Sequence, residues 1–274
     1  MRVATISYRD ALHTARIGDD GSAVLLADGD LGSLLQQTEG DIASLSSGDP
    51  IAAAEWRYSR LVNPRKVVCV GLNYRSHIIE MGRDLPTHPA LFAKFPDTLC
   101  GASDDIVLDR ASTGVDWEAE LTVVIGRTAR RVDETDALAH IAGYTVANDV
   151  SMRDWQRRTI QWMQGKNFEA STPVAAVMVT PDDVSHAADL RISTTVNGEL
   201  MQESSTSDLL FGPAALVAYI STFTTLNPGD LILTGTPGGV GEARTPPRFI
   251  QPDDIVEVSI DGIGSCRNRF VADR

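Results

Sequence analysis

The strongest apolar runs along the chain are short and rich in β-branched residues, which is typical of buried strands. After residue 65 they include KVVCV, LTVVIG, VAAVMVT, LRISTTV, LILTG and IVEVSI. Helical periodicity appears in fewer places, chiefly in residues 73–81, 135–141, 151–163 and 207–221. Because strands outnumber helices and do not alternate with them regularly, a doubly wound parallel sheet is disfavoured. The pattern predicts an α+β, strand-rich fold with a mixed, curled sheet and a few covering helices.

The first 60 residues differ from the rest in their pattern of apolar segments and turn signals. Short apolar pieces, such as Val3–Ile6 and Ala23–Leu26, are separated by turn signals, and a polar stretch then leads to an Asn-Pro dipeptide at residue 63. We therefore predict a small N-terminal β-rich domain over residues 1–62. The main domain, residues 63–274, opens with the KVVCV strand.

Charge and hydropathy narrow the classes of partner. The chain has 24 Lys plus Arg and 37 Asp plus Glu residues, a formal net charge of −13, and no local basic run. Nucleic acid is therefore not an expected partner. No run of 18 apolar residues occurs, so we predict no membrane segment and expect a cytoplasmic protein. Its three cysteines are far apart, without a CxxC pair, and are expected to be reduced.

Two acidic residues interrupt one of the apolar runs, GVDWEAELTVVIG. Strand alternation puts Glu118 and Glu120 on one face with Thr122, and Trp117 and Leu121 on the other. Two carboxylates about 7 Å apart on one face repel each other, and apolar surroundings raise the cost of ionising both. A hard divalent cation, Mg²⁺, Mn²⁺ or Ca²⁺, would satisfy them. The spacing alone leaves a solvated strand face equally open.

A third carboxylate follows another strand-like segment. In GYTVANDVSMRD, Asp149 comes after YTVAN and before a helical pattern, so it could complete a metal site. The same position could instead be a helix N-cap. Further on, Arg153 and Gln156 stand at i, i+3 and could hold a carboxylate ligand. Lys166, in GKNFE, could stabilise enolate charge, or be an ordinary surface lysine.

Two further features could serve catalysis. In CVGLNYRSHIIEMG, His77 and Glu80 share a helix face, and a carboxylate that orients a histidine makes a general base for water; a surface pair is the alternative. The Gly-rich loop Gly235–Gly241 follows a strand but lacks the GK[ST] ending of a phosphate-binding P-loop. Its backbone could approach a small ligand closely, with the Thr236 hydroxyl as a donor.

Together these motifs resemble the fumarylacetoacetate hydrolase (FAH) family, in particular its smaller acylpyruvase, oxaloacetate decarboxylase and hydroxyheptadienedioate isomerase members. The matching stretches span roughly residues 66–270 and are VGLNYRSHIIEMG, LFAKFP, VDWEAELTVVIG, GYTVANDVSMRDWQ, QGKNFEASTPV, VNGELMQ, PGDLILTGTPGGVG and VEVSIDGIGSCRN. The resemblance implies a curled mixed β-roll, usually a homodimer. It also implies Mg²⁺ or Mn²⁺ held by Glu118, Glu120 and Asp149.

The same resemblance implies roles for the remaining candidates. Substrate contacts map onto Lys94, Arg153, Gln156 and Thr236, and Lys166 is expected to contact the substrate and act in catalysis. His77 and Glu80 match a catalytic H-x-x-E dyad on a mobile lid.

These expectations lead to a function. We predict a metal-dependent hydrolase that cleaves a carbon–carbon bond in an acylpyruvate, such as fumarylpyruvate, through a metal-chelated enolate during breakdown of an aromatic compound. His77, oriented by Glu80, would activate the water. The alternatives are decarboxylation of oxaloacetate and isomerisation of 2-hydroxyhepta-2,4-diene-1,7-dioate. Outside enzymes, a non-catalytic protein that binds a 2-oxo acid is the remaining alternative.

Overall fold

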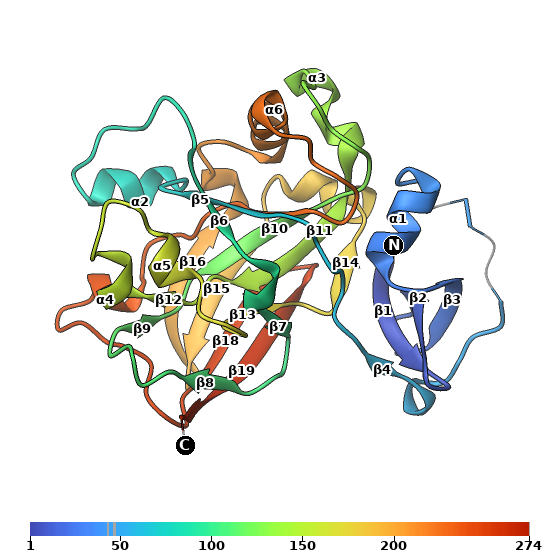
Figure 1. Ribbon diagram of the computed structural model, residues 1–274, viewed down its shortest axis with the longest axis horizontal. Coiled ribbons are helices and arrows are strands. Elements are labelled where there is room, and N and C mark those ends of the chain that lie inside the picture. Colours follow the sequence, from blue (N-terminus) through green and yellow to red (C-terminus); the bar gives the residue numbers. More distant parts are fainter. Residues whose placement is uncertain (43, 46–47, 274) are drawn as a thin grey trace.

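The computed structural model describes residues 1–42, 44–45 and 48–273, and leaves the side chain of Glu80 outside the description. The fold is strand-rich α+β, with two large curled sheets that pack against each other (Figure 1). The predicted fold class is confirmed. Within the described residues, no helix has both the length and the apolar character needed to cross a membrane.

The larger sheet has 12 strands, and its main path runs β3-β2-β1-β14-β11-β10-β17-β5-β6. Most neighbours are antiparallel, but β17 pairs parallel with β5, and β13 pairs parallel with β7, so the sheet is mixed as predicted. Its strands are β1 (Arg2–Tyr8), β2 (Ala11–Ile17), β3 (Ala23–Asp28), β4 (Arg57–Tyr58), β5 (Val67–Gly71), β6 (Ala90–Lys94), β7 (Leu99–Gly101), β10 (Ala119–Ile125), β11 (Ile141–Asn148), β13 (Thr172–Val174), β14 (Val177–Val179) and β17 (Leu231–Leu233).

A five-stranded sheet, ordered β16-β15-β18-β19-β8, packs against the larger one. Its strands are β8 (Ile106–Leu108), β15 (Arg191–Val196), β16 (Glu199–Ser205), β18 (Ile255–Ile260) and β19 (Gly264–Ala272). A separate pair joins β9 (Val115–Asp116) to β12 (Ser151–Met152). This small pair lies beside the residues that form the candidate site.

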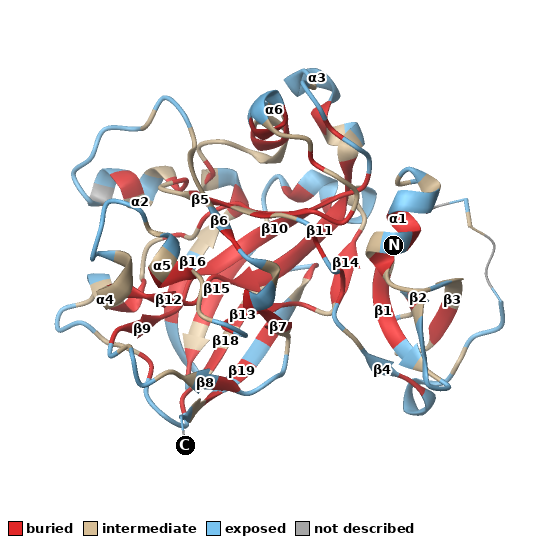
Figure 2. Ribbon diagram, viewed as in Figure 1, coloured by how far each residue is buried: buried red, intermediate tan, exposed pale blue. Residues whose placement is uncertain are grey.

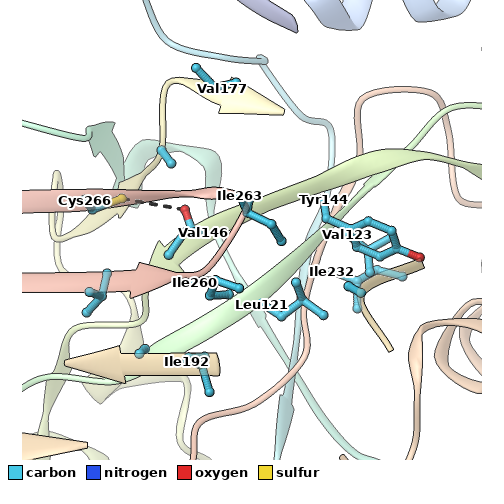
Figure 3. Packing of buried hydrophobic residues seen from close by; sticks show 14 of the residues in the cluster. Leu121, Val123, Tyr144, Val146, Val177, Ile192, Ile232, Ile260, Ile263 and Cys266 are labelled. Carbon is cyan, nitrogen blue, oxygen red and sulfur yellow. Dashed lines mark hydrogen bonds between the residues drawn. The ribbon is translucent and has the colours of Figure 1, made fainter. Parts of the chain in front are cut away.

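The core lies between the two large sheets. Leu121 and Val123 of β10 point into it together with Val146 of β11, and they meet Ile192 and Ile260 of the smaller sheet (Figure 3). Figure 2 shows β10 and β11 buried along their whole length. Because both faces of these strands are removed from water, any polar side chain on them needs a partner inside the protein.

The helices are few and short. They are α1 (Leu31–Thr38), α2 (Arg75–Glu80), α3 (Glu134–Ala137), α4 (Arg153–Gln156), α5 (Met163–Lys166) and α6 (Pro213–Phe223). Short 3₁₀ helices cover Ala53–Glu55, Pro96–Thr98, Leu138–His140, Pro181–Ala187, Thr206–Asp208 and Gly241–Ala243. Figure 1 shows α2, α4 and α5 gathered on the side of the roll away from the N-terminal strands.

The helix predicted over residues 151–163 is wrong for most of its length. Ser151 and Met152 are buried and pair with β9, so helix α4 starts only at Arg153 and ends after one turn. Residues 157–162 form no helix. Residues 151 and 152 are buried in a strand and residues 157–161 are exposed, with Ile160 94% exposed, so the helical spacing does not mark the buried face of a helix here.

The N-terminal region extends the larger sheet. Strand β1 pairs with β14, so β1–β3 continue the hydrogen-bonded path of the main strands. Leu31 and Leu35 of α1 belong to the same buried cluster as Val124 and Leu231, on the face of β10 opposite the core described above. The domain boundary at residue 62 stays a prediction.

Candidate metal centre and active site

Glu118 immediately precedes β10, Glu120 is its second residue, and both are buried. Glu118 is 7% exposed and Glu120 1%, so the interpretation of a solvated strand face is wrong. The predicted alternation is confirmed, because Trp117 and Leu121 lie on the other side, in the main core. The two carboxylates therefore sit in an interior where an isolated charge is costly.

Asp149 follows directly on β11, the antiparallel neighbour of β10. Ala119 pairs with Asn148 in the ladder, and the Asp149 N–H donates to the Glu118 carbonyl at 2.9 Å. One carboxylate oxygen each from Glu118, Glu120 and Asp149 lies within 4.8 Å of the others. The N-cap interpretation of Asp149 is wrong, since the residue before α4 is Met152.

Two buried lysines neutralise part of this acidic cluster. The Lys166 amine donates to Glu118 and to Asp149, each at 2.7 Å, and the Lys94 amine donates to Asp149 at 2.5 Å. Burial would lower the pKa of Lys166, but the charges of Asp149 and Glu118 raise it above its ordinary value. Burial would likewise raise the pKa of Asp149, but Lys166 and Lys94 hold it below the ordinary value. Lys166 is therefore a fixed cation.

Glu120 is the one carboxylate of the triad that neither lysine pairs with in the described residues. Its Oε2 accepts from the Gly235 N–H at 2.7 Å, and no lysine or arginine within the described ranges forms an ion pair with it. Burial, then the charges of Asp149 and Glu118, raise the pKa of Glu120 well above its ordinary value. A cation here would relieve that cost, and an all-carboxylate donor set suits Mg²⁺, Mn²⁺ or Ca²⁺. The residues present fit a hard divalent metal.

Arg153 ties the site to a residue that the sequence analysis missed, Asp116. The guanidinium contacts Asp116 through Nε at 2.8 Å, Glu118 through Nη1 at 2.6 Å and the Gln156 amide oxygen at 2.9 Å. Its Nη2 is buried without a hydrogen-bond partner in the part of the chain that the structure describes. The predicted proximity of Arg153 and Gln156 is confirmed, and one buried donor of Arg153 is left for a ligand.

The Gly-rich loop runs alongside the acidic strand and is held to it at several points. Trp117 Nε1 donates to the Gly239 carbonyl, and the Gly241 and Glu242 N–H groups donate to Asp116. Gly235, bonded to Glu120, has φ of 102°, and a Cβ there would come within 2.9 Å of the Val70 carbonyl oxygen. Glycine is therefore needed at this position. Spacing could not reveal these contacts because they join segments more than 100 residues apart.

A cavity of about 550 Å³ opens above the cluster. Six of the predicted site residues line it, namely His77, Glu118, Arg153, Gln156, Lys166 and Thr236. The lining does not include Glu120, Asp149 or Lys94. Asp149 instead contacts the two buried lysines, Lys94 and Lys166. The cavity therefore offers cationic and amide donors next to a carboxylate cluster, an arrangement suited to binding a small anion on a metal.

Two predicted residues need separate mention. Lys94 is paired with Asp149 and is not among the cavity-lining residues, so its role as a substrate contact stays a prediction. His77, on α2, lines the cavity, but the side chain of its expected partner, Glu80, lies outside the described residues. The dyad therefore also stays a prediction.

With fold and site described, the class of protein follows: the chain belongs to the fumarylacetoacetate hydrolase family. Residues 66–271 match the family model described as "Fumarylacetoacetate (FAA) hydrolase C-terminal". It is thus an enzyme-family member with a buried acidic cluster of the kind that holds a metal.

Particular relatives carry different activities in their names. "Oxaloacetate tautomerase fahd2, mitochondrial" from Xenopus laevis is 45% identical over 213 residues, 77% of this chain and 67% of that protein. The structure of 2-hydroxyhepta-2,4-diene-1,7-dioate isomerase from Mycobacterium marinum superposes with a TM-score of 0.82 at 33% identity, covering 99% of this chain and 98% of that one. The structure of fumarylpyruvate hydrolase from Pseudomonas aeruginosa, in complex with Mn²⁺ and pyruvate, superposes with a TM-score of 0.71 at 31% identity. The match covers 78% of this chain and 93% of that one.

Proposed function

We propose that this protein is a divalent-metal-dependent enzyme that interconverts the enol and keto forms of a small 2-oxo diacid of the oxaloacetate class. The observation that carries the proposal is the cavity in which Lys166 and Arg153 face a buried carboxylate triad. The choice of tautomerisation is supported by the Xenopus relative at 45% identity. This shifts the emphasis from hydrolysis, predicted first from the sequence, towards its isomerase alternative.

The cofactor would be held by Glu118, Glu120 and Asp149. A bound Mg²⁺ or Mn²⁺ would act as a Lewis acid towards the 2-oxo group and favour loss of the neighbouring proton. Lys166, a fixed cation against Glu118 and Asp149, would stabilise negative charge on the substrate oxygen. Arg153, Gln156 and Thr236 would bind the carboxylate groups of the substrate and fix its orientation.

Tautomerisation moves one proton and leaves every other atom in place. The hydroxyl oxygen on C2 of the enol loses a proton, C3 gains one and the double bond moves from C2–C3 to C2–O, so an acid–base side chain in the cavity is sufficient. His77 is the cavity residue proposed for this role, because an imidazole can both accept and donate a proton. Glu80 is proposed to orient it.

Acylpyruvate hydrolysis is the second candidate, supported by the Pseudomonas hydrolase bound to Mn²⁺ and pyruvate. Both reactions place negative charge on the same 2-oxo oxygen, so Lys166 would serve either one. Hydrolysis additionally needs a water activated by His77 next to a second carbonyl. Diene-dioate isomerisation, the activity named for the Mycobacterium marinum structure, again needs only proton transfer.

A substrate panel distinguishes these activities. Enol-oxaloacetate, acetylpyruvate, fumarylpyruvate and 2-hydroxyhepta-2,4-diene-1,7-dioate are followed by absorbance with Mg²⁺ or Mn²⁺, with and without chelator, and pyruvate release reports oxaloacetate decarboxylation. We expect metal-dependent ketonisation of oxaloacetate to be fastest, and a Lys166→Met variant to lose it. Faster cleavage of an acylpyruvate would favour hydrolysis instead. Absence of metal-dependent turnover throughout the panel would contradict the enzyme proposal and favour a 2-oxo-acid-binding protein.

The predicted homodimer and cytoplasmic location stay predictions. The Xenopus relative is named as mitochondrial, so location needs its own test in cells.

A further inference from the structure

One buried amide links the acidic strand to the Gly-rich loop. Gln202, on β16 of the smaller sheet, is 1% exposed and is not among the residues predicted for the site. Its Oε1 accepts from the Ala119 N–H at 3.1 Å and from the Thr194 hydroxyl at 2.7 Å. Its Nε2 donates to the Pro237 carbonyl at 2.9 Å and to the Thr236 hydroxyl oxygen at 2.8 Å. All four positions of the amide are therefore used.

The orientation of this amide is determined by its neighbours. A backbone N–H can only donate and a backbone carbonyl can only accept. Ala119 therefore requires the amide oxygen on its side, and Pro237 requires the amide NH₂ on the other. Rotating the amide by half a turn would break both bonds and leave two buried backbone groups unpaired, which is costly.

This orientation determines what the Thr236 hydroxyl can do. Because the Gln202 NH₂ donates to the Thr236 oxygen, the hydroxyl hydrogen must point elsewhere. No acceptor for that hydrogen occurs among the described residues, and Thr236 lines the cavity. The hydroxyl is left as a donor towards the cavity.

A second unpartnered donor lies on a residue that lines the same cavity. Arg153 lines it, and the buried Nη2 of Arg153 has no acceptor within the described chain. Donors without acceptors around one cavity favour a ligand group that only accepts, and an ionised carboxylate has that property. A ligand group that can only donate, such as an ammonium, would leave the Thr236 hydroxyl hydrogen unpaired.

We propose that Gln202 is a positioning residue that makes the Thr236 hydroxyl an obligatory donor, so that the group bound there is an acceptor oxygen, in particular a substrate carboxylate. The inference rests on the proposed function for its choice of 2-oxo-acid ligands. Gln202 acts through Thr236 and does not itself line the cavity.

A double-mutant cycle tests this coupling. Pyruvate binding to the Mn²⁺-loaded full chain is measured by calorimetry for the wild type, Gln202→Met, Thr236→Val and the double variant. We expect each single change to weaken binding about 10-fold or more, the range for losing a hydrogen bond to a charged group. The double variant should bind no more weakly than Thr236→Val, because Gln202 acts through that hydroxyl. Additive losses in the double variant would overturn the proposal.

Two further variants separate positioning from folding. Thr194→Val removes the other hydroxyl contact of the Gln202 amide and leaves Thr236 untouched, so pyruvate affinity should stay within about twofold. Gln202→Glu keeps the shape and the acceptor side but presents an acceptor to Thr236, which would turn the hydroxyl hydrogen away from the cavity and weaken binding. Wild-type affinity in a folded Gln202→Glu variant would count against the proposal.

Measuring KM for oxaloacetate with the same four proteins tests this inference separately from the proposed function. Non-additive pyruvate binding without turnover would support the role of Gln202 and contradict the activity. If the Gln202 variants are active and keep the wild-type KM, the role of Gln202 would be contradicted, whereas the proposed function would stand. A positioning role should change KM more than kcat, whereas general loosening of the site would change both.

Discussion

The Lys94 amine lies 2.5 Å from the Asp149 carboxylate, and both side chains are completely removed from solvent. Because both charges are desolvated, each partner depends on the other for its stabilisation. Neither residue is among the cavity-lining residues, and the ion pair holds one member of the carboxylate triad in place.

Removing that lysine should be strongly destabilising. Lys94→Met leaves a buried Asp149 with Lys166 as its remaining cation, and we expect the free energy of unfolding to fall by about 3–5 kcal/mol. Urea unfolding in the presence of chelator measures this directly. Arg191→Met is the control, because Arg191 and Glu203 form an ion pair in which both side chains are about half exposed, and its loss should cost at most about 1 kcal/mol. Equal losses in the two variants would argue against a special role for the buried pair.

A glycine on β5 makes room for an aromatic wall of the cavity. A Cβ on Gly71 would lie 2.3 Å from Cζ3 of Trp162, which packs edge-on against Phe92 and lines the cavity. Gly71→Ala should therefore displace Trp162, cost about 1–3 kcal/mol and raise KM. Unfolding curves and steady-state kinetics measure the two effects. Gly32→Ala, where a Cβ meets its neighbours at 3.9 Å, should not destabilise; a harmless Gly71→Ala would contradict the packing described.

The N-cap of α1 should make stability depend on pH. Asp30 accepts from the Ser33 N–H at 2.8 Å and from the Asn63 amide at 2.9 Å. Burial would raise the pKa of Asp30, but these hydrogen bonds outweigh it and lower the pKa below its ordinary value. The folded state therefore binds this proton less readily than the unfolded state. Its contribution is present above the unfolded pKa of about 3.9 and is lost as pH falls through the lower, folded pKa.

Asp30→Ala should accordingly cost about 1 kcal/mol at pH 7. The difference from wild type should shrink below about pH 4, where the wild-type carboxyl begins to be protonated. Thermal or urea unfolding at the two pH values gives the comparison. A difference that stays constant with pH would show that the charge of Asp30 has no part in the cap.

The site residues that could be predicted from the sequence are those whose position in or after an apolar strand is itself unusual. Glu118 and Glu120 are visible because carboxylates interrupt an apolar strand, and Asp149 because it ends the next strand. Asp116 and Gln202 were missed because their partners lie far along the chain; the Gln202 amide meets Ala119 across 83 positions. The helix expected at residues 151–163 failed because pairing of Ser151 and Met152 with β9 outweighed helical periodicity. Tertiary hydrogen bonding decided the parts that local patterns did not.

The central claim is that Glu118, Glu120 and Asp149 form a divalent metal site, and calorimetric titration with Mn²⁺ tests it most directly. The wild type should bind one Mn²⁺ per chain at the site. Glu120→Gln, which keeps an acceptor for the Gly235 N–H, should weaken binding by about 100-fold or more, since loss of outer contacts alone costs about 10- to 100-fold. Glu242→Gln, a nearby acid outside the triad, should bind as the wild type does. Unchanged stoichiometry and affinity in Glu120→Gln would contradict the assignment of the metal site.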